Sequence, residues 1–191
     1  MNGYWAGVLG ASAGGQAALR RILGALPPDF PAPLLVVQHR GPRGGKFLIR
    51  DLDEATALSV KEADEKEPVR PGVVYVAPAN YHLLVETDGY LSLSVGERVQ
   101  FARPSIDVLF EAAADAWGPR LVGGVLTGAN RDGSAGLRRV ADRGGFALVQ
   151  DPDKAESAAM PRAALAAVPE ARVLPLMAIG PFFSLLFQET E

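Results

Sequence analysis

The sequence predicts an α/β fold: a three-layer, doubly wound and mostly parallel sheet with helices on both faces and an antiparallel hairpin. Three observations predict it. Apolar segments of strand length alternate with segments of helical periodicity along the chain. Several of the strand segments are uniformly apolar, as in strands that are covered on both faces. One pair of segments near the middle alternates in period two around a turn, which is typical of a hairpin.

The first third of the chain predicts a strand, a helix and a second strand. Residues 4–10 form a short apolar run that ends at a glycine. Residues 16–26 place leucine and isoleucine side chains on one helical face, and two prolines stop this helix. Residues 34–37 are continuously apolar, so we expect a strand there that is covered on both faces. The next expected elements are a helix at 47–55 and strands at 58–62 and 73–77.

The middle of the chain predicts the hairpin and a capped helix. Residues 82–87 and 90–95 alternate in period two around a central Asp-Gly turn. Residues 104–117 carry apolar side chains on one helical face, and Ser105 is a candidate N-cap for this helix. The remaining expected elements are strands at 121–126 and 146–150 and helices at 133–143, 161–167 and 180–188.

Length and composition restrict the possible functions. A chain of 191 residues is the size of one domain, so residues 1–191 are expected to form a single domain. The net charge of −3 argues against nucleic acid as a partner. Cysteine is absent, which excludes disulfides, thiolate metal sites and cysteine nucleophiles. No apolar run approaches the ~20 residues of a membrane helix and no signal peptide is visible, so we expect a cytoplasmic protein without membrane insertion.

The first candidate site is the loop between the first strand and the first helix. Its sequence Gly-Ala-Ser-Ala-Gly, with Ser12 at the centre, matches G-x-S-x-G in the strand–turn–helix context that exposes a nucleophilic serine. Two alternatives stay open, because a glycine-rich turn before a helix also cradles phosphates or is only a turn. The loop has no Walker lysine, however, and Ser12 stands where a dinucleotide motif has its middle glycine.

Two further loops carry possible partners for Ser12. Of the two histidines, His39 lies at the carboxyl end of a predicted strand, whereas His82 opens a hairpin strand. The position of His39 favours it as a base, and His82 is expected to have a structural role. Asp132 lies in a third strand-to-helix loop and could orient an imidazole. The alternative for Asp132 is that it only caps the helix that follows it.

These residues and their surroundings resemble the catalytic domain of the chemotaxis protein-glutamate methylesterases, the CheB family. The resemblance runs nearly from end to end, and several motifs occur in the same order. The segments that carry it are 8–15, 37–39, 60–63, 71–72, 75–78, 103–110, 126–128, 132–133 and 160–163.

The resemblance implies a reaction and roles for the candidate residues. It implies that Ser12 is the nucleophile, His39 the base and Asp132 the group that orients the base. The backbone N–H groups of Ala13 and Ala129 would form the oxyanion hole. The family removes methyl groups from glutamate γ-methyl esters on the cytoplasmic helices of methyl-accepting chemoreceptors and releases methanol, and some members deamidate receptor glutamines. No cofactor and no metal are expected.

The chain departs from the usual pattern of the family at three places. Ala129-Asn130 stands where the family usually has Met-Gly, and residues 40–45 replace a hydrophobic-Pro-Pro stretch after His39. Because the first strand is expected to begin at Tyr4, we expect no receiver domain, which commonly precedes the catalytic domain in the family, within this sequence; the sequence is either a separate catalytic domain or a fragment. The departures leave two alternative functions: a catalytically weak binding module for chemoreceptors or signalling partners, and a small-molecule esterase.

Overall fold

A parallel sheet forms the centre of the computed structural model, which describes residues 5–40 and 45–188. Its strands are β1 (Ala6–Ala11), β2 (Leu34–Gln38), β3 (Ser59–Glu62), β4 (Val73–Val76), β7 (Leu121–Val125), β8 (Phe146–Gln150) and β9 (Arg172–Leu174). They follow the order β3-β4-β2-β1-β7-β8-β9, and all neighbouring pairs are parallel. The order reverses direction at β1, which therefore marks the switch point where open α/β sheets place their sites.

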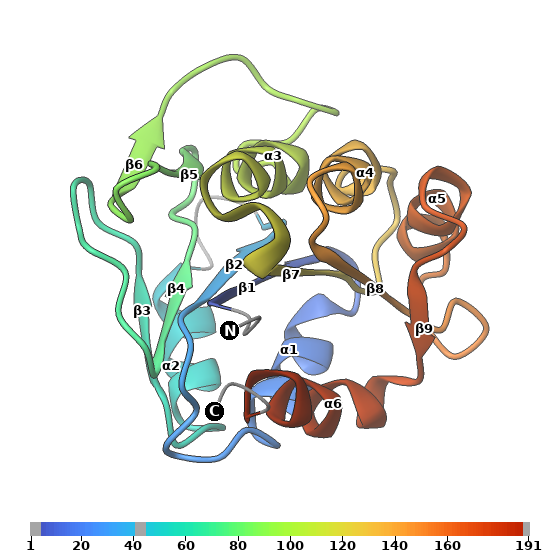
Figure 1. The fold of residues 1–191 in the computed structure, drawn as a ribbon, viewed down its shortest axis with the longest axis horizontal. Helices are drawn as coiled ribbons and strands as arrows, with labels where there is room; N and C mark the ends of the chain where they lie inside the picture. The colour runs from blue at the N-terminus through green and yellow to red at the C-terminus, as the bar shows by residue number, and fades with distance from the viewer. Residues whose placement is uncertain (1–4, 41–44, 189–191) are drawn as a thin grey trace.

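Helices cover both faces of this sheet. The helices are α1 (Gly15–Leu23), α2 (Gly45–Asp53), α3 (Ile106–Trp117), α4 (Ser134–Asp142), α5 (Ala159–Ala167) and α6 (Leu176–Gln188), with a 3₁₀ turn at Gly118–Arg120. Figure 1 shows α3, α4 and α5 on one face and α1, α2 and α6 on the other. The fold class predicted from the sequence is thus confirmed. None of the described helices has the length and apolar character needed to cross a membrane.

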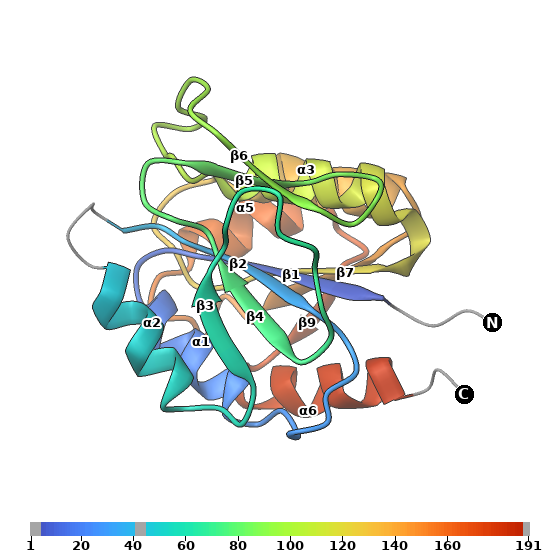
Figure 2. The same cartoon turned by 90° about the vertical axis from the view of Figure 1, so that its left-hand side faces the viewer.

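The predicted hairpin forms a separate two-stranded sheet. Strands β5 (His82–Val85) and β6 (Leu91–Ser94) pair in antiparallel register and are not part of the seven-stranded sheet. They lie on the α3 side of the molecule (Figure 2), where β5 contacts α3. Ser105 caps α3 as expected, because its side chain accepts a hydrogen bond from the backbone N–H of Val108.

The last two elements differ from the sequence prediction. Strand β9 was not predicted, because it is a three-residue edge strand in which only Leu174 is buried. Helix α6 begins at Leu176 rather than at Gly180. The Gly180-Pro181 pair looks like a helix start, but a Cβ on Gly180 would come within 2.7 Å of the Ile22 carbonyl oxygen. Glycine is therefore needed there for the packing of α6 against α1, not for a helix boundary.

Smaller differences concern the ends of two early elements. Helix α1 stops at Leu23, three residues before the predicted end, because Gly24 is its C-cap and a turn follows. The described part of the first strand begins at Ala6, and Tyr4 lies outside the described residues. Most of the 40–45 stretch that departs from the family pattern, residues 41–44, also lies outside them.

Candidate active site

Ser12 and His39 leave two adjacent strands at neighbouring positions. Ala11 and Gln38, the last residues of β1 and β2, lie opposite each other in the sheet. Ser12 follows Ala11 and His39 follows Gln38, so both candidate residues leave the sheet at the same level. These ends lie on the side of the sheet opposite to the start of β1 (Figure 2). Ser12 and His39 line one pocket of about 370 Å³. The structure therefore brings the predicted nucleophile and the predicted base to the same cavity.

Asp132 lies beneath this pocket and is fully buried. Its Oδ2 is 2.7 Å from His39 Nε2 and accepts a hydrogen bond from the backbone N–H of Ile106 at 2.7 Å. Its Oδ1 accepts hydrogen bonds from the Ser105 hydroxyl at 2.8 Å and from the Asp107 backbone N–H at 3.0 Å. The carboxylate thus has four donors and holds the imidazole against the start of α3.

These contacts correct the simpler alternative for Asp132. The N-cap of α4, the helix that follows Asp132 in sequence, is Gly133, and no side chain caps it. Asp132 instead accepts backbone hydrogen bonds at the amino end of α3, where a carboxylate is stabilised by the helix dipole. Asp132 therefore accepts hydrogen bonds from the start of α3 and from the imidazole of His39. Its position in the sequence, just before α4, does not indicate the contact with α3.

Two buried carboxyl groups at this place have opposite pKa shifts. Burial alone raises the pKa of Asp132, but the hydrogen bonds from His39 and from the α3 backbone outweigh it and hold this pKa below its usual value. Burial raises the pKa of Asp107 to about 6, against hydrogen bonds from Gly136 and Gly133, and the charge of Asp132 adds to the rise. Asp132 is thus kept ionised, while Asp107 titrates in a mildly acidic range.

Gln38 connects the first two loops, and sequence reasoning did not single it out. It is 8% exposed, and its amide nitrogen donates hydrogen bonds to the carbonyl oxygens of Ser12 and His39, both at 2.9 Å. One side chain thus fixes the backbone at both candidate residues. The sequence does hold one indication of this role: Gln38 is a polar residue at the end of an otherwise apolar strand, where a buried side chain is expected to be apolar.

Thr127 connects the Ser12 loop to the loop after β7. Its hydroxyl lies 2.8 Å from the Ala13 carbonyl oxygen and accepts a hydrogen bond from the Ser157 backbone N–H. The backbone N–H groups of Ala13 and Ala129, expected to form an oxyanion hole, donate no hydrogen bond to any described residue. Neither residue lines the pocket of Ser12 and His39, so their role as oxyanion donors stays a prediction.

The other ring nitrogen of His39 faces Asn130. The Asn130 amide nitrogen lies 3.3 Å from His39 Nδ1, and the Asn130 amide oxygen accepts a hydrogen bond from the Asp132 backbone N–H at 3.1 Å. The Ser12 hydroxyl makes no hydrogen bond within the described part of the chain, although Ser12 and Asn130 line the same pocket. Asn130 is one of the residues at which the sequence departs from the usual family pattern.

His82 is not part of the pocket. It is 3% exposed, its Nε2 is 2.8 Å from the Glu97 carbonyl oxygen, and its Nδ1 accepts the Ser105 backbone N–H at 3.2 Å. Both ring nitrogens are thus bonded to backbone groups, which agrees with the structural role expected for this histidine.

The mouth of the pocket is formed by the segment between β6 and α3. This segment adds Arg98, Phe101 and Arg103 to the pocket lining. Phe101 is 94% exposed and has a positive φ of 64° next to another positive φ at Gln100. A bulky residue in this conformation is strained by about 1–2 kcal/mol. The fold thus presents an aromatic ring and basic side chains beside the Ser12–His39 pocket.

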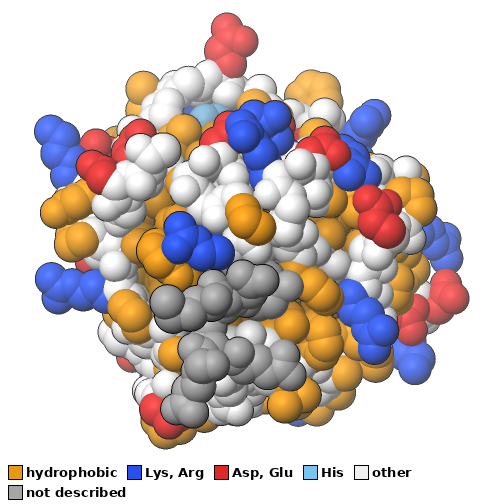
Figure 3. Space-filling view, viewed as in Figure 1, with side chains coloured by type: hydrophobic (Ala, Val, Ile, Leu, Met, Phe, Trp, Pro, Cys, Tyr) orange, Lys and Arg blue, Asp and Glu red, His pale blue; other side chains and the backbone are white. Residues whose placement is uncertain are grey.

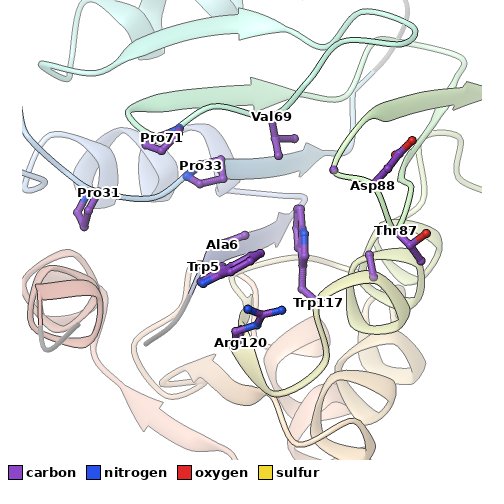
Figure 4. Close-up of a pocket in the computed structure, with 12 residues that line it drawn as sticks. Trp5, Ala6, Pro31, Pro33, Val69, Pro71, Thr87, Asp88, Trp117 and Arg120 are labelled. Atoms are coloured by element: carbon purple, nitrogen blue, oxygen red, sulfur yellow. The ribbon is translucent and has the colours of Figure 1, made fainter. Parts of the chain in front are cut away.

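A second concavity of about 550 Å³ lies at the amino ends of the strands. Figure 4 shows Trp5, Trp117 and Arg120 on its walls, and the Arg120 guanidinium lies 3.5 Å from the centre of the Trp5 ring. Ser12, His39 and Asp132 do not line it. Figure 3 shows acidic and basic side chains interspersed on this side of the molecule, which matches the small net charge.

Within the described ranges no cluster of three or more His, Asp or Glu side chains is arranged to hold a metal ion.

Comparison with known proteins identifies relatives over nearly the whole chain. Residues 7–183 match the family model described as CheB methylesterase. A protein of Leptospira interrogans, provisionally named protein-glutamate methylesterase/protein-glutamine glutaminase, is 49% identical over 97% of this chain and 96% of its own length. A Symbiobacterium thermophilum protein named protein-glutamate methylesterase/protein-glutamine glutaminase is 41% identical over 91% of this chain, which spans 48% of that relative.

A solved structure has the same fold. The crystal structure of the Thermotoga maritima CheB methylesterase catalytic domain superposes with a TM-score of 0.92 and 33% sequence identity. The match covers 96% of this chain and 98% of that domain. The similarity therefore includes the strand ends and loops that carry the pocket described above.

Proposed function

The chain belongs to the CheB methylesterase family, and we propose that it is a serine hydrolase that removes methyl groups from glutamate γ-methyl esters of chemoreceptors. The observation that carries this proposal is the 2.7 Å contact between His39 Nε2 and Asp132, with the other ring nitrogen facing the pocket that Ser12 lines. An imidazole whose one nitrogen is held by a buried carboxylate is oriented to use the other as a base.

The proposed reaction is acyl transfer through Ser12. The Ser12 Oγ attacks the ester carbonyl carbon while His39 Nδ1 takes the hydroxyl proton. The backbone N–H groups of Ala13 and Ala129 stabilise the negative charge that develops on the carbonyl oxygen. The C–O bond to the methoxy group then breaks, and the His39 imidazolium returns its proton so that methanol leaves. Water, activated by His39, hydrolyses the remaining glutamyl ester on Ser12 and yields a free glutamate.

Asp132 has a defined part in this sequence. Its carboxylate fixes the tautomer in which Nε2 carries the hydrogen and Nδ1 carries the lone pair, and it stabilises the imidazolium that forms after proton transfer. The low pKa of the Asp132 carboxyl keeps it ionised throughout the neutral range. The same steps with a glutamine side chain release ammonia in place of methanol, and the names of several relatives include that glutaminase activity.

The proposed partner is a chemoreceptor segment in the cytoplasm. A methylated glutamate has to enter a pocket whose mouth carries Arg98, Arg103 and the exposed ring of Phe101. Basic side chains suit a receptor helix on which other glutamates flank the esterified one, because opposite charges steer the encounter. The aromatic ring offers an apolar contact beside the reacting group.

The experiment that tests this function compares two substrates. Wild-type protein is incubated with methylated receptor fragments, and released methanol is measured; in parallel it is incubated with a small activated ester, p-nitrophenyl acetate. We expect methanol release that is lost in Ser12→Ala and a much lower kcat/KM for the small ester. Activity on the small ester alone would indicate a small-molecule esterase, and activity on neither would indicate a binding module.

A further inference from the structure

The side chain of Asn130 occupies the ring nitrogen that the proposed reaction requires. The Asn130 amide oxygen accepts the Asp132 backbone N–H, so the amide nitrogen is the atom directed at His39 Nδ1, at 3.3 Å. The Asp132 carboxylate requires the hydrogen to be on His39 Nε2, which leaves Nδ1 as an acceptor. Asn130 therefore donates to the lone pair of the base.

In the proposed reaction the Ser12 hydroxyl needs the lone pair to which Asn130 donates. A neutral imidazole has one acceptor nitrogen, and that nitrogen accommodates one donor in good geometry. The Ser12 hydroxyl makes no hydrogen bond to any residue in 5–40 or 45–188. A distance of 3.3 Å is longer than the usual 2.9–3.0 Å, so the bond from Asn130 is weak and can be displaced.

We propose that Asn130 latches the catalytic base in the substrate-free enzyme and that substrate displaces it. This inference rests on the proposed function of Ser12 and His39. Asn130 lines the same pocket as Ser12 and His39, so a glutamyl side chain that fills the pocket meets the Asn130 amide. When the amide moves away, His39 Nδ1 is free to accept the Ser12 hydroxyl. Asn130 is thus a positioning residue that restrains basal activity and acts through His39.

Two variants separate this role from a merely structural one. Asn130→Ala removes the donor, and we expect it to raise kcat/KM for p-nitrophenyl acetate about three- to tenfold, the effect of one ordinary hydrogen bond. Asn130→Asp keeps an oxygen for the Asp132 backbone N–H but places a second carboxylate beside the imidazole. We expect kcat/KM of that variant for p-nitrophenyl acetate to fall about tenfold or more at neutral pH. Two carboxylates favour the protonated ring, which has no lone pair to accept the serine proton.

The basic residues near the ring are unchanged in these variants. Arg40, Arg98 and Arg103 line the same pocket as His39, and the carboxylate that contacts the ring is that of Asp132. If Asn130 served only to accept the Asp132 backbone N–H, the activities of the two variants would rank in the opposite order. Asn130→Asp would then be close to wild type, and Asn130→Ala would be slower and less stable.

A spectroscopic measurement tests the latch without relying on activity. The chain has two histidines, so ¹⁵N-histidine labelling gives a simple spectrum, and the His82 resonances serve as an internal control in the same tautomer. We expect Ser12→Ala to leave the His39 Nδ1 resonance unchanged in the wild-type background. In the Asn130→Ala background, where Ser12 takes over the bond, Ser12→Ala should move this resonance to higher frequency.

Two outcomes would overturn the proposal about Asn130, and a third would overturn only the proposed function. The proposal is overturned if Ser12→Ala moves the Nδ1 resonance of the otherwise wild-type protein, because Ser12 would then already hold that nitrogen. It is also overturned if folded Asn130→Ala is no faster than wild type while Asn130→Asp is at least as active. If wild type hydrolyses neither substrate, the proposed function fails, and the resonance comparison still decides whether Asn130 holds Nδ1.

Discussion

His39 Nε2 lies 2.7 Å from Asp132 Oδ2, and the same carboxylate oxygen accepts the backbone N–H of Ile106 at the start of α3. The orientation of the imidazole is therefore tied to the position of a helix that packs in the core. Because Asp132 is fully buried and has four donors, it cannot rotate without leaving hydrogen-bonding groups unpaired. One ring nitrogen of His39 is therefore fixed on Asp132, and the other faces the Asn130 amide in the pocket.

Asp132→Asn should reduce both turnover and stability. The amide cannot replace the charge that fixes the tautomer of His39, and comparable changes in serine hydrolases lower kcat by up to ~10⁴. Its NH₂ group also faces backbone or imidazole donors, so we expect the free energy of unfolding to fall by about 1–3 kcal/mol. Turnover of the folded fraction and urea unfolding measure the two effects, with Asp142→Asn, an exposed aspartate of α4, as the control. A folded variant within a few-fold of wild-type turnover would remove Asp132 from the site.

The two histidines should respond differently to alanine substitution. His39→Ala should lower turnover by orders of magnitude, because His39 is part of the proposed reaction. It also removes one donor from the buried Asp132 carboxylate, so we expect the free energy of unfolding to fall by about 1–3 kcal/mol. His82→Ala should lower the free energy of unfolding by about 2–4 kcal/mol, because it leaves a cavity and unpaired backbone groups. Its folded fraction should keep most of the activity. Loss of activity in a fully folded His82→Ala protein would contradict the assignment of the base.

Asp107 should make the protein less stable as pH rises through the mildly acidic range. Its pKa is about 6 in the folded protein, above its usual value of 3.8, so the folded state holds this proton more tightly than the unfolded state. The resulting stability is present below about pH 4 and is lost as pH rises to about 6. Asp107→Asn keeps an acceptor for the glycine N–H groups and should stabilise the protein at pH 7 by about 3 kcal/mol. The gain should shrink towards pH 4; an equal effect at both pH values would contradict the raised pKa.

Phe101→Ala should affect the protein substrate far more than a small ester. If the exposed ring contacts the receptor segment, its removal should raise KM for methylated receptor about tenfold, the effect of losing one aromatic anchor. Kinetics with p-nitrophenyl acetate should change much less, because that small ester has no extended chain to dock on the exposed ring. Leu185→Ala is the matched control, an exposed apolar residue on α6 at the opposite face of the sheet. Equal KM values for the two variants would argue against docking at Phe101.

The sequence predicted the architecture and most elements because their apolar periodicities are strong and their ends carry glycine, proline or capping residues. It also predicted that Ser12, His39 and Asp132 lie in strand-to-helix loops, and parallel pairing then brings such loops together. Their catalytic roles remain predictions.

Contacts between elements could not be predicted in the same way. The bonds of Gln38 to two carbonyl oxygens, and of Asp132 to the start of α3, depend on the register of neighbouring strands and on how a helix packs. The contact between Asn130 and His39 joins residues 91 positions apart. Strand β9 was missed for a similar reason, because pairing with β8 rather than its own apolar pattern defines it.

Covalent labelling of the nucleophile tests the central claim most directly. A fluorophosphonate reacts when a serine Oγ attacks phosphorus and fluoride leaves, with the hydroxyl proton taken by the adjacent base. Peptide mapping by mass spectrometry after labelling then identifies the modified serine. We expect the adduct on Ser12, with labelling strongly reduced in His39→Ala and absent in Ser12→Ala. A stable, folded Ser12→Ala protein that is still labelled at another serine and still releases methanol from methylated receptor would contradict the account.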